Sequence, residues 1–340
     1  MDESPLRLTQ SYSSSTMDYI SGWCKSKRLL EGHTIIVTGA NSGIGKYTAL
    51  DLFQRGATVI MACRNTTKAE EAKIEIENMA VNAKVRGKLI IEKLDLSSLK
   101  SVRGFCLRML ESETRIDVLI NNAGVMWCPN GRTEDGFETH IGTNHFGHAL
   151  LTLLLLPRLI KSTPARVVTV ASMANIVYSL DLDDINVEKT GYGGFKAYSK
   201  SKCANILFSR ALHLKLQEHG INGVTTYSLH PGIVGTELGR HLDSSIISGA
   251  TWVFNNVLKL MIKSSRCGAQ TNIYCAVDEG CANESGHYYS ECSKSIVLSK
   301  QCKNDDYALK LWDLTIEKLK LQGYDPFNTM SLDRKYLQVE

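Results

Sequence analysis

The sequence lacks any run of about 18 apolar residues, the length that a membrane-spanning helix needs. The nearest candidate, residues 246–262, is interrupted by Asn255, Asn256 and Lys259, and three interpretations stay open for it: a lid, a membrane-touching helix or plain core. The N-terminal stretch "MDESPLRLTQSYSSST" has no apolar run either, unlike a secretory signal or a transit peptide. These absences predict a cytoplasmic protein without a transmembrane span, with peripheral membrane contact left open.

Signs of metal or nucleic-acid binding are also missing. The ten cysteines contain no C-x-x-C pair and no zinc-like spacing, so we interpret them as reduced, mostly buried thiols. His145 and His148 lie one helical turn apart, but no third ligand is evident, so both are predicted to be structural and no metal is expected. The 39 Lys and Arg residues nearly balance 35 Asp and Glu residues, without a dense basic block. Nucleic acid is therefore not an expected partner.

What the sequence does contain is a long alternation of strand and helix patterns. Apolar, β-branched runs that are typical of buried strands occur at residues 33–39, 57–63, 88–96, 115–124, 165–172, 221–232 and 286–290. Helical patterns occur at residues 44–55, 68–79, 99–110, 136–160, 197–218 and 305–322. Sustained alternation of this kind predicts the α/β class, with a doubly wound parallel sheet and helices on both faces.

No change in composition supports a second folded domain. We expect one domain over residues 31–325, with a substrate-side segment at about 233–285. Residues 1–30 are Ser-rich without sustained periodicity, so they predict a flexible N-terminal tail. Residues 326–340 are expected to form a C-terminal tail.

Three glycines lie where the first predicted strand meets the first helix. The turn "TGANSGIG" (38–45) contains Gly39, Gly43 and Gly45. Glycine lets a pyrophosphate approach the backbone closely, and a helix N-terminus offers free N–H groups and the positive end of the helix dipole. Because a strand precedes the turn and a helix follows it, a dinucleotide site is predicted. The alternative is a glycine-rich turn that binds nothing.

Arg64 stands where an acidic residue would select NAD. In a NAD site, an Asp or Glu at the end of the second strand holds the ribose hydroxyls. This sequence has Cys63 and Arg64 there, and Lys46 adds positive charge from the first helix. A guanidinium can bind two oxygens of a 2′-phosphate. The sequence therefore favours NADP(H) over NAD(H), against the alternative of an exposed loop arginine.

An ordered set of motifs makes the chain resemble the short-chain dehydrogenase/reductase family from about residue 32 to 322. The motifs are "TGANSGIG" (38–45), "ACRN" (62–65), "LDLSSL" (94–99), "NNAG" (121–124), "TNHFGH" (143–148), Ser172, "YSKSK" (198–202) and "HPG" (230–232). Within the family the chain looks most like the retinol dehydrogenase branch. The resemblance implies a Rossmann-type sheet of about seven strands and hydride transfer to or from NADP(H), and it leaves a homodimer open.

The resemblance also implies roles for individual residues. The catalytic set is Asn144, Ser172, Tyr198 and Lys202. Tyr198 would exchange the proton, with its pKa lowered by the Lys202 ammonium, while Ser172 would bind the substrate oxygen and Asn144 a relay water. The implied cofactor-binding residues are Gly39, Asn41, Ser42, Gly43, Ile44, Gly45, Arg64, Asp95, Leu96, Asn122, Ala123, Gly124, Tyr198, Lys202, Pro231, Gly232, Val234 and Thr236.

The chain departs from the family pattern in three places. Ala171 precedes Ser172 where a Ser-Ser pair is usual. About 25 residues separate Ser172 from Tyr198, more than in compact family members, and the extra loop is expected to shape the substrate pocket. We also expect no N-terminal membrane anchor of the kind that is common in retinol dehydrogenases, because residues 1–30 contain no apolar run.

The pattern Tyr-x-x-x-Lys occurs twice, as Tyr192/Lys196 and as Tyr198/Lys202. A tyrosine and a lysine at this spacing meet only on one face of a helix. Two glycines separate the first pair, and each disfavours helix by ~1 kcal/mol. No glycine interrupts the second pair, and an apolar stripe of helical spacing follows it. We therefore predict that Tyr198 is catalytic and that Tyr192 lies in a loop near the pocket mouth.

The predicted substrate pocket is apolar. Its candidate residues are Met126, Trp127, Ile233, Trp252 and Phe254. They offer no anchor for a carboxylate or a phosphate, which favours a lipophilic alcohol or carbonyl such as a retinoid, a steroid, an aldehyde or a ketone. The leading interpretation is an NADP-dependent alcohol dehydrogenase or carbonyl reductase. The rival is a catalytically quiet, cofactor-binding interaction protein with the same fold, against which the complete catalytic set counts.

Overall fold

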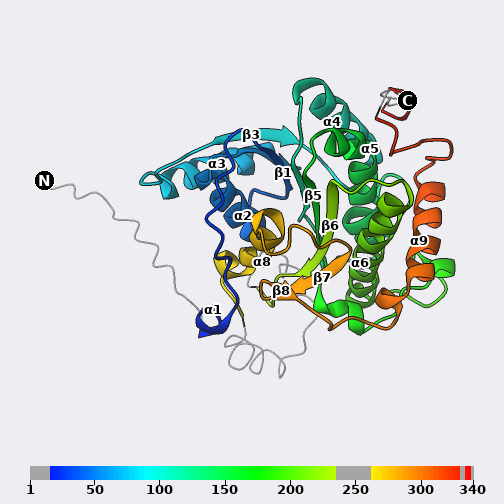
Figure 1. Ribbon diagram of the computed structural model, residues 1–340. Helices are drawn as coiled ribbons and strands as arrows, with labels where there is room; N and C mark the ends of the chain where they lie inside the picture. The colour runs from blue at the N-terminus through cyan, green and yellow to red at the C-terminus, as the bar shows by residue number, and fades with distance from the viewer. Residues whose placement is uncertain (1–15, 235–261, 330–333, 338–340) are drawn as a thin grey trace, which may run out of the picture.

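Eight strands form a single sheet in the computed structural model, which describes residues 16–234, 262–329 and 334–337 (Figure 1). The strand order is β3-β2-β1-β4-β5-β6-β7-β8. The strands are β1 (Thr34–Thr38), β2 (Thr58–Cys63), β3 (Lys88–Lys93), β4 (Val118–Asn121), β5 (Ala165–Val170), β6 (Val224–His230), β7 (His287–Ser290) and β8 (Ser293–Lys294). Strands β1 to β7 are parallel and only β8 is antiparallel. The α/β class with a seven-stranded parallel sheet is thus confirmed, and β8 is a short addition.

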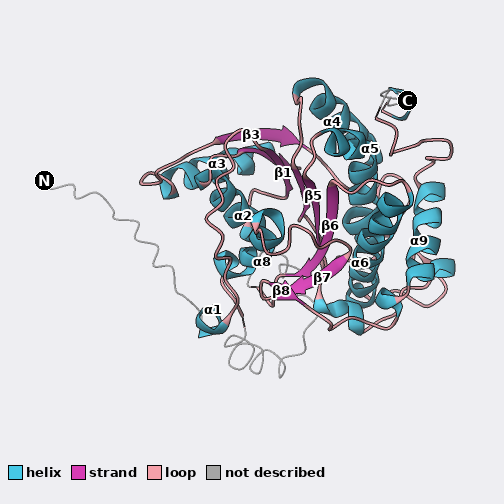
Figure 2. Ribbon diagram, in the orientation of Figure 1, coloured by secondary structure: helices cyan, strands magenta, loops and turns pink. Residues whose placement is uncertain are grey.

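Two helical layers cover the sheet (Figure 2). The helices are α1 (Thr16–Ile20), α2 (Gly43–Gln54), α3 (Thr66–Met79), α4 (Leu99–Ser112), α5 (Gly147–Lys161), α6 (Gly194–Glu218), α8 (Ser265–Val277) and α9 (Asp305–Lys318). Helices α2, α3 and α8 pack into one apolar core, and α4, α5, α6 and α9 into the other. Strand β1 contributes to both cores because successive side chains of a strand point to opposite faces of the sheet. Ile35 and Val37 pack into the first core and Ile36 into the second.

Helix α8 lies within the substrate-side segment, and no helix was predicted at its position. It packs beside α2 and against the sheet, and ten of its thirteen residues are buried. The buried residues include small and polar ones such as Gly268 and Asn272. A helix buried on nearly every side shows no apolar stripe, so the periodicity that reveals amphipathic helices is missing.

Residues 16–30 differ from the predicted flexible tail, because they pack against α8 and the end of β7. The Asp18 carboxylate accepts a hydrogen bond from the Ser264 N–H at 3.0 Å, and the Cys24 N–H donates to Gln270 at 3.2 Å. The predicted C-terminal tail also differs, because Tyr336 is buried and its hydroxyl donates to the Gln322 carbonyl. Residues 16–30 and 334–337 therefore belong to the folded body.

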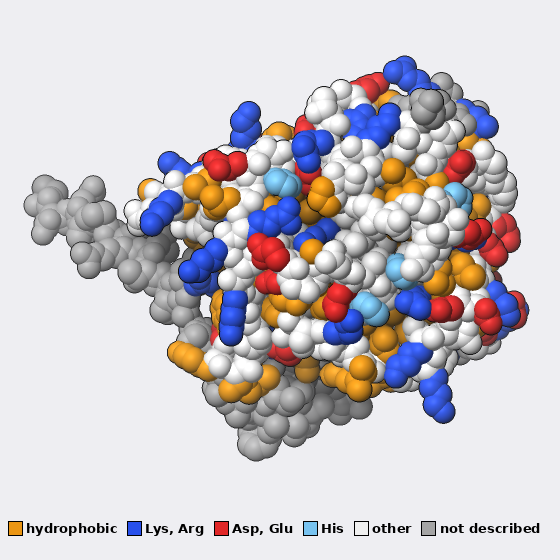
Figure 3. Space-filling view, viewed as in Figure 1, with side chains coloured by type: hydrophobic (Ala, Val, Ile, Leu, Met, Phe, Trp, Pro, Cys, Tyr) orange, Lys and Arg blue, Asp and Glu red, His pale blue; other side chains and the backbone are white. Residues whose placement is uncertain are grey.

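Within these described ranges, no helix has the length and apolarity of a membrane span. Most of segment 246–262 and the predicted residues Thr236, Trp252 and Phe254 lie outside the described residues. On the face drawn in Figure 3, Lys and Arg side chains are interspersed with Asp and Glu side chains.

Candidate active site

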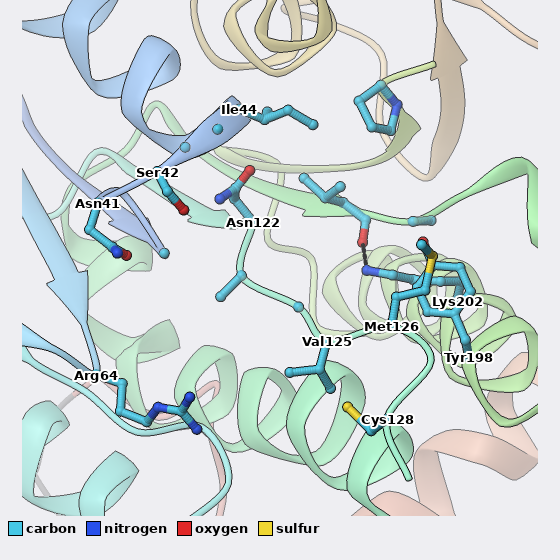
Figure 4. A pocket seen from close by; sticks show the side chains of 18 of the residues that line it. Asn41, Ser42, Ile44, Arg64, Asn122, Val125, Met126, Cys128, Tyr198 and Lys202 are labelled. Atoms are coloured by element: carbon cyan, nitrogen blue, oxygen red, sulfur yellow. Dashed lines mark hydrogen bonds between the residues drawn. The ribbon is translucent and has the colours of Figure 1, made fainter. Parts of the chain in front are cut away.

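A cleft of about 320 Å³ opens at the carboxyl edge of the sheet (Figure 4). It lies where β1 and β4 end, between which the strand order reverses, and such a switch point is where ligands bind in open α/β sheets. The residues that line it are Gly39, Asn41, Ser42, Gly43, Ile44, Gly45, Arg64, Asn65, Lys68, Asn122, Ala123, Gly124, Val125, Met126, Cys128, Val170, Ala171, Tyr198, Lys202 and Pro231.

The glycines of the turn after β1 lie where the side chain of any other residue would collide with its neighbours or strain the backbone. Gly39 has a φ of +67°, in the left-handed region. A Cβ at Gly45 would lie 2.3 Å from the Gly39 carbonyl oxygen and 2.6 Å from Asn122 Nδ2. The N-cap residue of α2, Ser42, makes no side-chain cap hydrogen bond. The first N–H groups of α2 are therefore available to an anion in the cleft.

Thr38 ties this turn to the "NNAG" turn after β4. Its Oγ1 accepts hydrogen bonds from the N–H groups of Asn122 and Ala123, both at 2.9 Å. The same hydroxyl lies 2.9 Å from Nε2 of His148, whose Nδ1 lies 3.0 Å from the Asn144 carbonyl oxygen. Burial lowers the pKa of His148 to about 3, so the neutral ring donates from Nδ1 and accepts at Nε2. Neither Thr38 nor this role of His148 was predicted.

The basic end of the cleft is formed by Arg64 and Lys68. Asn65 accepts a hydrogen bond from the Lys68 N–H at 2.9 Å and so caps α3. Lys46, the second cation predicted for this end, instead forms an ion pair with Glu75 at 2.5 Å and does not line the cleft. Lys68 lines the cleft instead and was not predicted.

At the other end, Tyr198 and Lys202 line the cleft from the N-terminal half of α6. Burial raises the pKa of Tyr198, which a hydrogen bond to Ser172 partly opposes. This direction is the opposite of the predicted lowering, because burial is the largest influence on the pKa of Tyr198 in the protein without cofactor. Lys202 Nζ lies 5.8 Å from the Tyr198 ring centroid and donates to the Val170 carbonyl at 2.9 Å, as the dashed line in Figure 4 marks. Burial lowers the pKa of Lys202 to about 8.

Asn144 lies on a π-helical stretch (η1, Ile141–Phe146) directly before α5. Its Oδ1 accepts from the Val125 N–H at 2.8 Å, and its Nδ2 donates to the Val125 carbonyl and to the Ser201 hydroxyl. A Cβ on Gly124 would lie 3.3 Å from Asn144 Oδ1 and 3.4 Å from Lys202 Nζ. The Asn144 side chain thus fixes the cleft wall that follows the "NNAG" turn.

Tyr192 and Lys196 do not meet. Tyr192 precedes α6, and its hydroxyl donates to the Cys128 carbonyl at 2.5 Å. Lys196 donates instead to the Thr190 carbonyl at 2.7 Å. The helix begins at Gly194, so the prediction that Tyr192 lies in a loop beside the pocket is confirmed.

Known proteins are similar to this chain in sequence. The sequence profile of the short chain dehydrogenase family matches residues 33–246. Retinol dehydrogenase 12 of Homo sapiens is 44% identical over 304 residues, which cover 89% of this chain and 92% of that protein. The chain belongs to the short-chain dehydrogenase/reductase family. Retinol dehydrogenase 11 of Homo sapiens is 45% identical over 301 residues, with 88% and 90% covered, and places the chain in the retinol dehydrogenase-like branch of the family.

Solved structures of this family agree with the fold. A crystallised uncharacterised protein from Mycobacterium paratuberculosis has a TM-score of 0.68 and 35% identity over 88% of this chain and 98% of that one. The NADP complex of RhlG from Pseudomonas aeruginosa has a TM-score of 0.58 at 23% identity, covering 76% and 94%, which shows the fold alone. The chain is therefore a short-chain oxidoreductase with a site for a nicotinamide cofactor.

Some of the site residues that the family resemblance implied do not line the cleft. Among the described residues, Asn144, Ser172, Asp95, Leu96, Gly232 and Val234 do not line it. Asp95 accepts hydrogen bonds from the N–H and the hydroxyl of Ser97, so it shapes the turn before α4. Conversely, Asn65, Lys68, Val125, Cys128, Val170 and Ala171 line the cleft without having been predicted as cofactor or pocket residues.

Proposed function

We propose that the protein transfers a hydride between NADP(H) and a lipophilic alcohol or carbonyl compound, with Tyr198 as the general acid and base. The observation that supports this most is the position of Tyr198. It lies buried against the cleft, hydrogen-bonded to Ser172, at the opposite end from Arg64 of a cavity whose other walls are the glycine turn and the "NNAG" turn.

The residues of the cleft fit a nicotinamide dinucleotide. The glycine turn and the start of α2, whose N-cap Ser42 makes no side-chain cap hydrogen bond, would hold its pyrophosphate through free backbone N–H groups. The lining residues within the described part of the chain include three cations, Arg64, Lys68 and Lys202, and no carboxylate. That balance suits a cofactor with an additional 2′-phosphate, which Arg64 and Lys68 would bind. When bound, the nicotinamide supplies the hydride acceptor or donor.

The chain's own residues handle the proton. Tyr198, kept protonated by its raised pKa, donates its hydroxyl proton to the substrate oxygen during carbonyl reduction. The resulting tyrosinate is stabilised by the Ser172 hydroxyl and by the Lys202 ammonium. Ser172 also offers a hydrogen bond to the developing oxyanion. Asn144 holds the cleft wall through its hydrogen bond with the Val125 N–H, and His148 in turn binds the Asn144 carbonyl.

The substrate side supports a lipophilic ligand. Val125, Met126 and Cys128 form the wall beyond the "NNAG" turn (Figure 4). Trp127 stacks on Phe195 with ring centroids 5.4 Å apart, next to this wall. The relatives named retinol dehydrogenases point in the same direction, so we place retinoid-like alcohols and aldehydes first among the candidate substrates.

The test is steady-state oxidation of NADPH and of NADH by the purified full chain. Retinaldehyde, a ketosteroid and a long-chain aldehyde serve as substrates. We expect turnover with at least one of them and a KM for NADPH at least tenfold below that for NADH, the equivalent of about 1.4 kcal/mol. Tight NADPH binding without turnover on any lipophilic carbonyl would favour the quiet, cofactor-binding alternative instead.

A further inference from the structure

Two buried thiols from distant parts of the chain lie in direct contact. Cys203 belongs to α6 and directly follows Lys202, and Cys302 belongs to a short 3-10 helix (η7, Gln301–Lys303) ahead of α9. The two Sγ atoms lie 3.2 Å apart, although 99 positions separate the residues. A disulfide bond of about 2.05 Å would require the sulfur atoms to approach by only about 1 Å. The fold therefore brings the two thiols almost to bonding distance.

This contact distinguishes the pair from the other cysteines. All ten cysteines are free, and all lie in the described part of the chain. Cys106, for example, is also fully buried, but its Sγ lies 4.0 Å from the Leu151 carbonyl oxygen. Among the described residues, a hydrogen-bonding contact between two cysteine sulfurs occurs only at Cys203 and Cys302. Oxidation can therefore join these two thiols with the least movement.

The surroundings hold both thiols in place. Helix α6 packs against α9 and against η7, which precedes α9 (Figure 1). The Cys302 N–H donates to the Ser299 hydroxyl at 3.2 Å. Next to it, the Gln301 side chain accepts the Leu180 N–H and donates to the Leu180 carbonyl, both at 2.7 Å. Both ends of η7 are thus fixed, and Cys302 stays facing Cys203.

The contact also makes the two thiols unequal. A hydrogen bond from the Cys203 thiol lowers the pKa of Cys302 below its ordinary value, although burial opposes this. The same contact, together with burial, raises the pKa of Cys203, so Cys203 keeps its proton. Cys302 is 4% exposed, against 0% for Cys203. Because the thiolate is the nucleophilic form, Cys302 is the thiol that attacks, and a resolving thiol already lies beside it.

We propose that Cys203 and Cys302 form a reversible disulfide on reaction with a small hydroperoxide, with Cys302 as the attacking and Cys203 as the resolving thiol. The Cys302 sulfur attacks the terminal peroxide oxygen, the O–O bond breaks, and Cys302 becomes a sulfenic acid while the alcohol leaves. The Cys203 sulfur then attacks the Cys302 sulfur, the S–O bond breaks, and water leaves with the Cys203 proton. The two thiols together lose two electrons, which reduce the hydroperoxide to an alcohol and water, or hydrogen peroxide to two waters.

This site is separate from the proposed hydride transfer. Neither thiol lines the cleft, and the reaction uses no nicotinamide cofactor. The oxidant has to be small because both sulfurs are almost fully buried. A bridge between α6 and η7 would close a loop of about a hundred residues, and crosslinks across long loops restrict the unfolded chain most. The oxidised protein should therefore resist heat better than the reduced protein.

The experiment treats the full wild-type chain with hydrogen peroxide, alkylates the remaining thiols after unfolding, and digests without a reductant. Trypsin cleaves after Lys and Arg, so it places Cys203 in the peptide 203–210 and Cys302 in the peptide 301–303. We expect these two peptides to be recovered joined, and separate after dithiothreitol. Cys106 should be recovered alkylated. Free Cys203 and Cys302 after peroxide, or disulfides spread among the other cysteines, would overturn the proposal.

Thermal unfolding of two variants tests the consequence. Peroxide should raise the Tm of the wild type by at least about 5 °C and leave that of Cys302→Ala unchanged. Cys106→Ala, which also removes a buried thiol, should keep the rise. Each variant is compared with itself before and after peroxide, so a general loss of stability does not affect the result. A rise that persists in Cys302→Ala would contradict the assignment, and the wild-type peptide map decides the question even where a variant fails to fold.

Discussion

We propose that the choice between NADPH and NADH depends most on the side chain of Arg64. It lines the basic end of the cleft, where an acidic residue would repel a 2′-phosphate. We expect Arg64→Asp to weaken NADPH binding by about 1.5–3 kcal/mol, the range for a hydrogen bond to a charged group, and NADH binding little. Titration calorimetry with both cofactors measures this difference.

Lys46→Met is the matched control for Arg64→Asp. Lys46 is also a cation near the start of α2, but its ammonium is paired with Glu75. The structure therefore predicts unchanged affinity for both cofactors in Lys46→Met. Equal affinity of the wild type for NADPH and NADH would remove the basis of the Arg64 argument.

If Lys202 binds the cofactor as proposed, cofactor use should depend on pH. Burial lowers its pKa from 10.5 to about 8, so the ammonium is present below this pH and is lost as pH rises through it. Since the cofactor is a polyanion, kcat/KM for NADPH should fall as pH rises above about 8, because this parameter reports the free enzyme. Tyr198 has a raised pKa and adds no loss in this range during carbonyl reduction.

The pH profile of Lys202→Met provides the control. Without an ammonium, the variant should have a low kcat/KM for NADPH at every pH and no fall near pH 8. A wild-type profile that stays flat from neutral pH to well above 8 would show that Lys202 does not titrate there.

At the scale of elements, the start of α2 determines whether the cofactor can approach. Gly45→Ala would place a Cβ 2.3 Å from the Gly39 carbonyl oxygen, so the turn must shift. We expect a loss of about 1–3 kcal/mol of stability, typical of overpacking, and a marked loss of NADPH affinity. Gly104→Ala in α4 is the control, because its Cβ would meet only Arg108 Nη1 at 3.7 Å, and alanine favours helix by about 0.5–1 kcal/mol. Thermal unfolding with and without NADPH compares the two variants.

Elements with a clear periodicity were predictable, and those without one were not. Helix α6 could be placed because Gly193 and Gly194 mark its start, and the Tyr198/Lys202 pair and the apolar stripe follow within it. The π-helical stretch before α5 could not, since a backbone that holds Asn144 against Val125 leaves no mark in the spacing of apolar residues. Similarly, the glycine turn predicted a phosphate-binding site. Only the structure shows that Lys68, rather than Lys46, lines the cleft beside this turn.

At the scale of the whole molecule, the alternation of strands and helices was enough to predict one parallel sheet, but not where the folded body begins and ends. Residues 16–30 are held by partners more than 200 positions away, such as Ser264 and Gln270. Contacts of this kind depend on three-dimensional placement, and a Ser-rich segment without periodicity gives no sign of them. The same holds for Tyr336, which packs on the core formed by α4 and α9.

Asp18→Ala tests whether the N-terminal segment belongs to the fold. The variant leaves the Ser264 N–H without its acceptor, so we expect a loss of about 1–3 kcal/mol in the free energy of unfolding. Ile20→Ala, whose side chain is 75% exposed, should change stability little. Chemical denaturation of both variants gives the comparison, and identical stability of Asp18→Ala and wild type would mean that this segment is a tail after all.

The proposed mechanism depends most on Tyr198 being the proton donor. The direct test is to measure NADPH oxidation by Tyr198→Phe and Tyr192→Phe side by side. Tyr198→Phe should fold and bind NADPH, but its kcat should fall by about the 10²–10⁴-fold typical of losing a general acid. Tyr192→Phe loses only its hydrogen bond to the Cys128 carbonyl, so it should keep most of kcat and change KM at most. An inactive Tyr192→Phe, or full activity in both variants, would contradict the assignment.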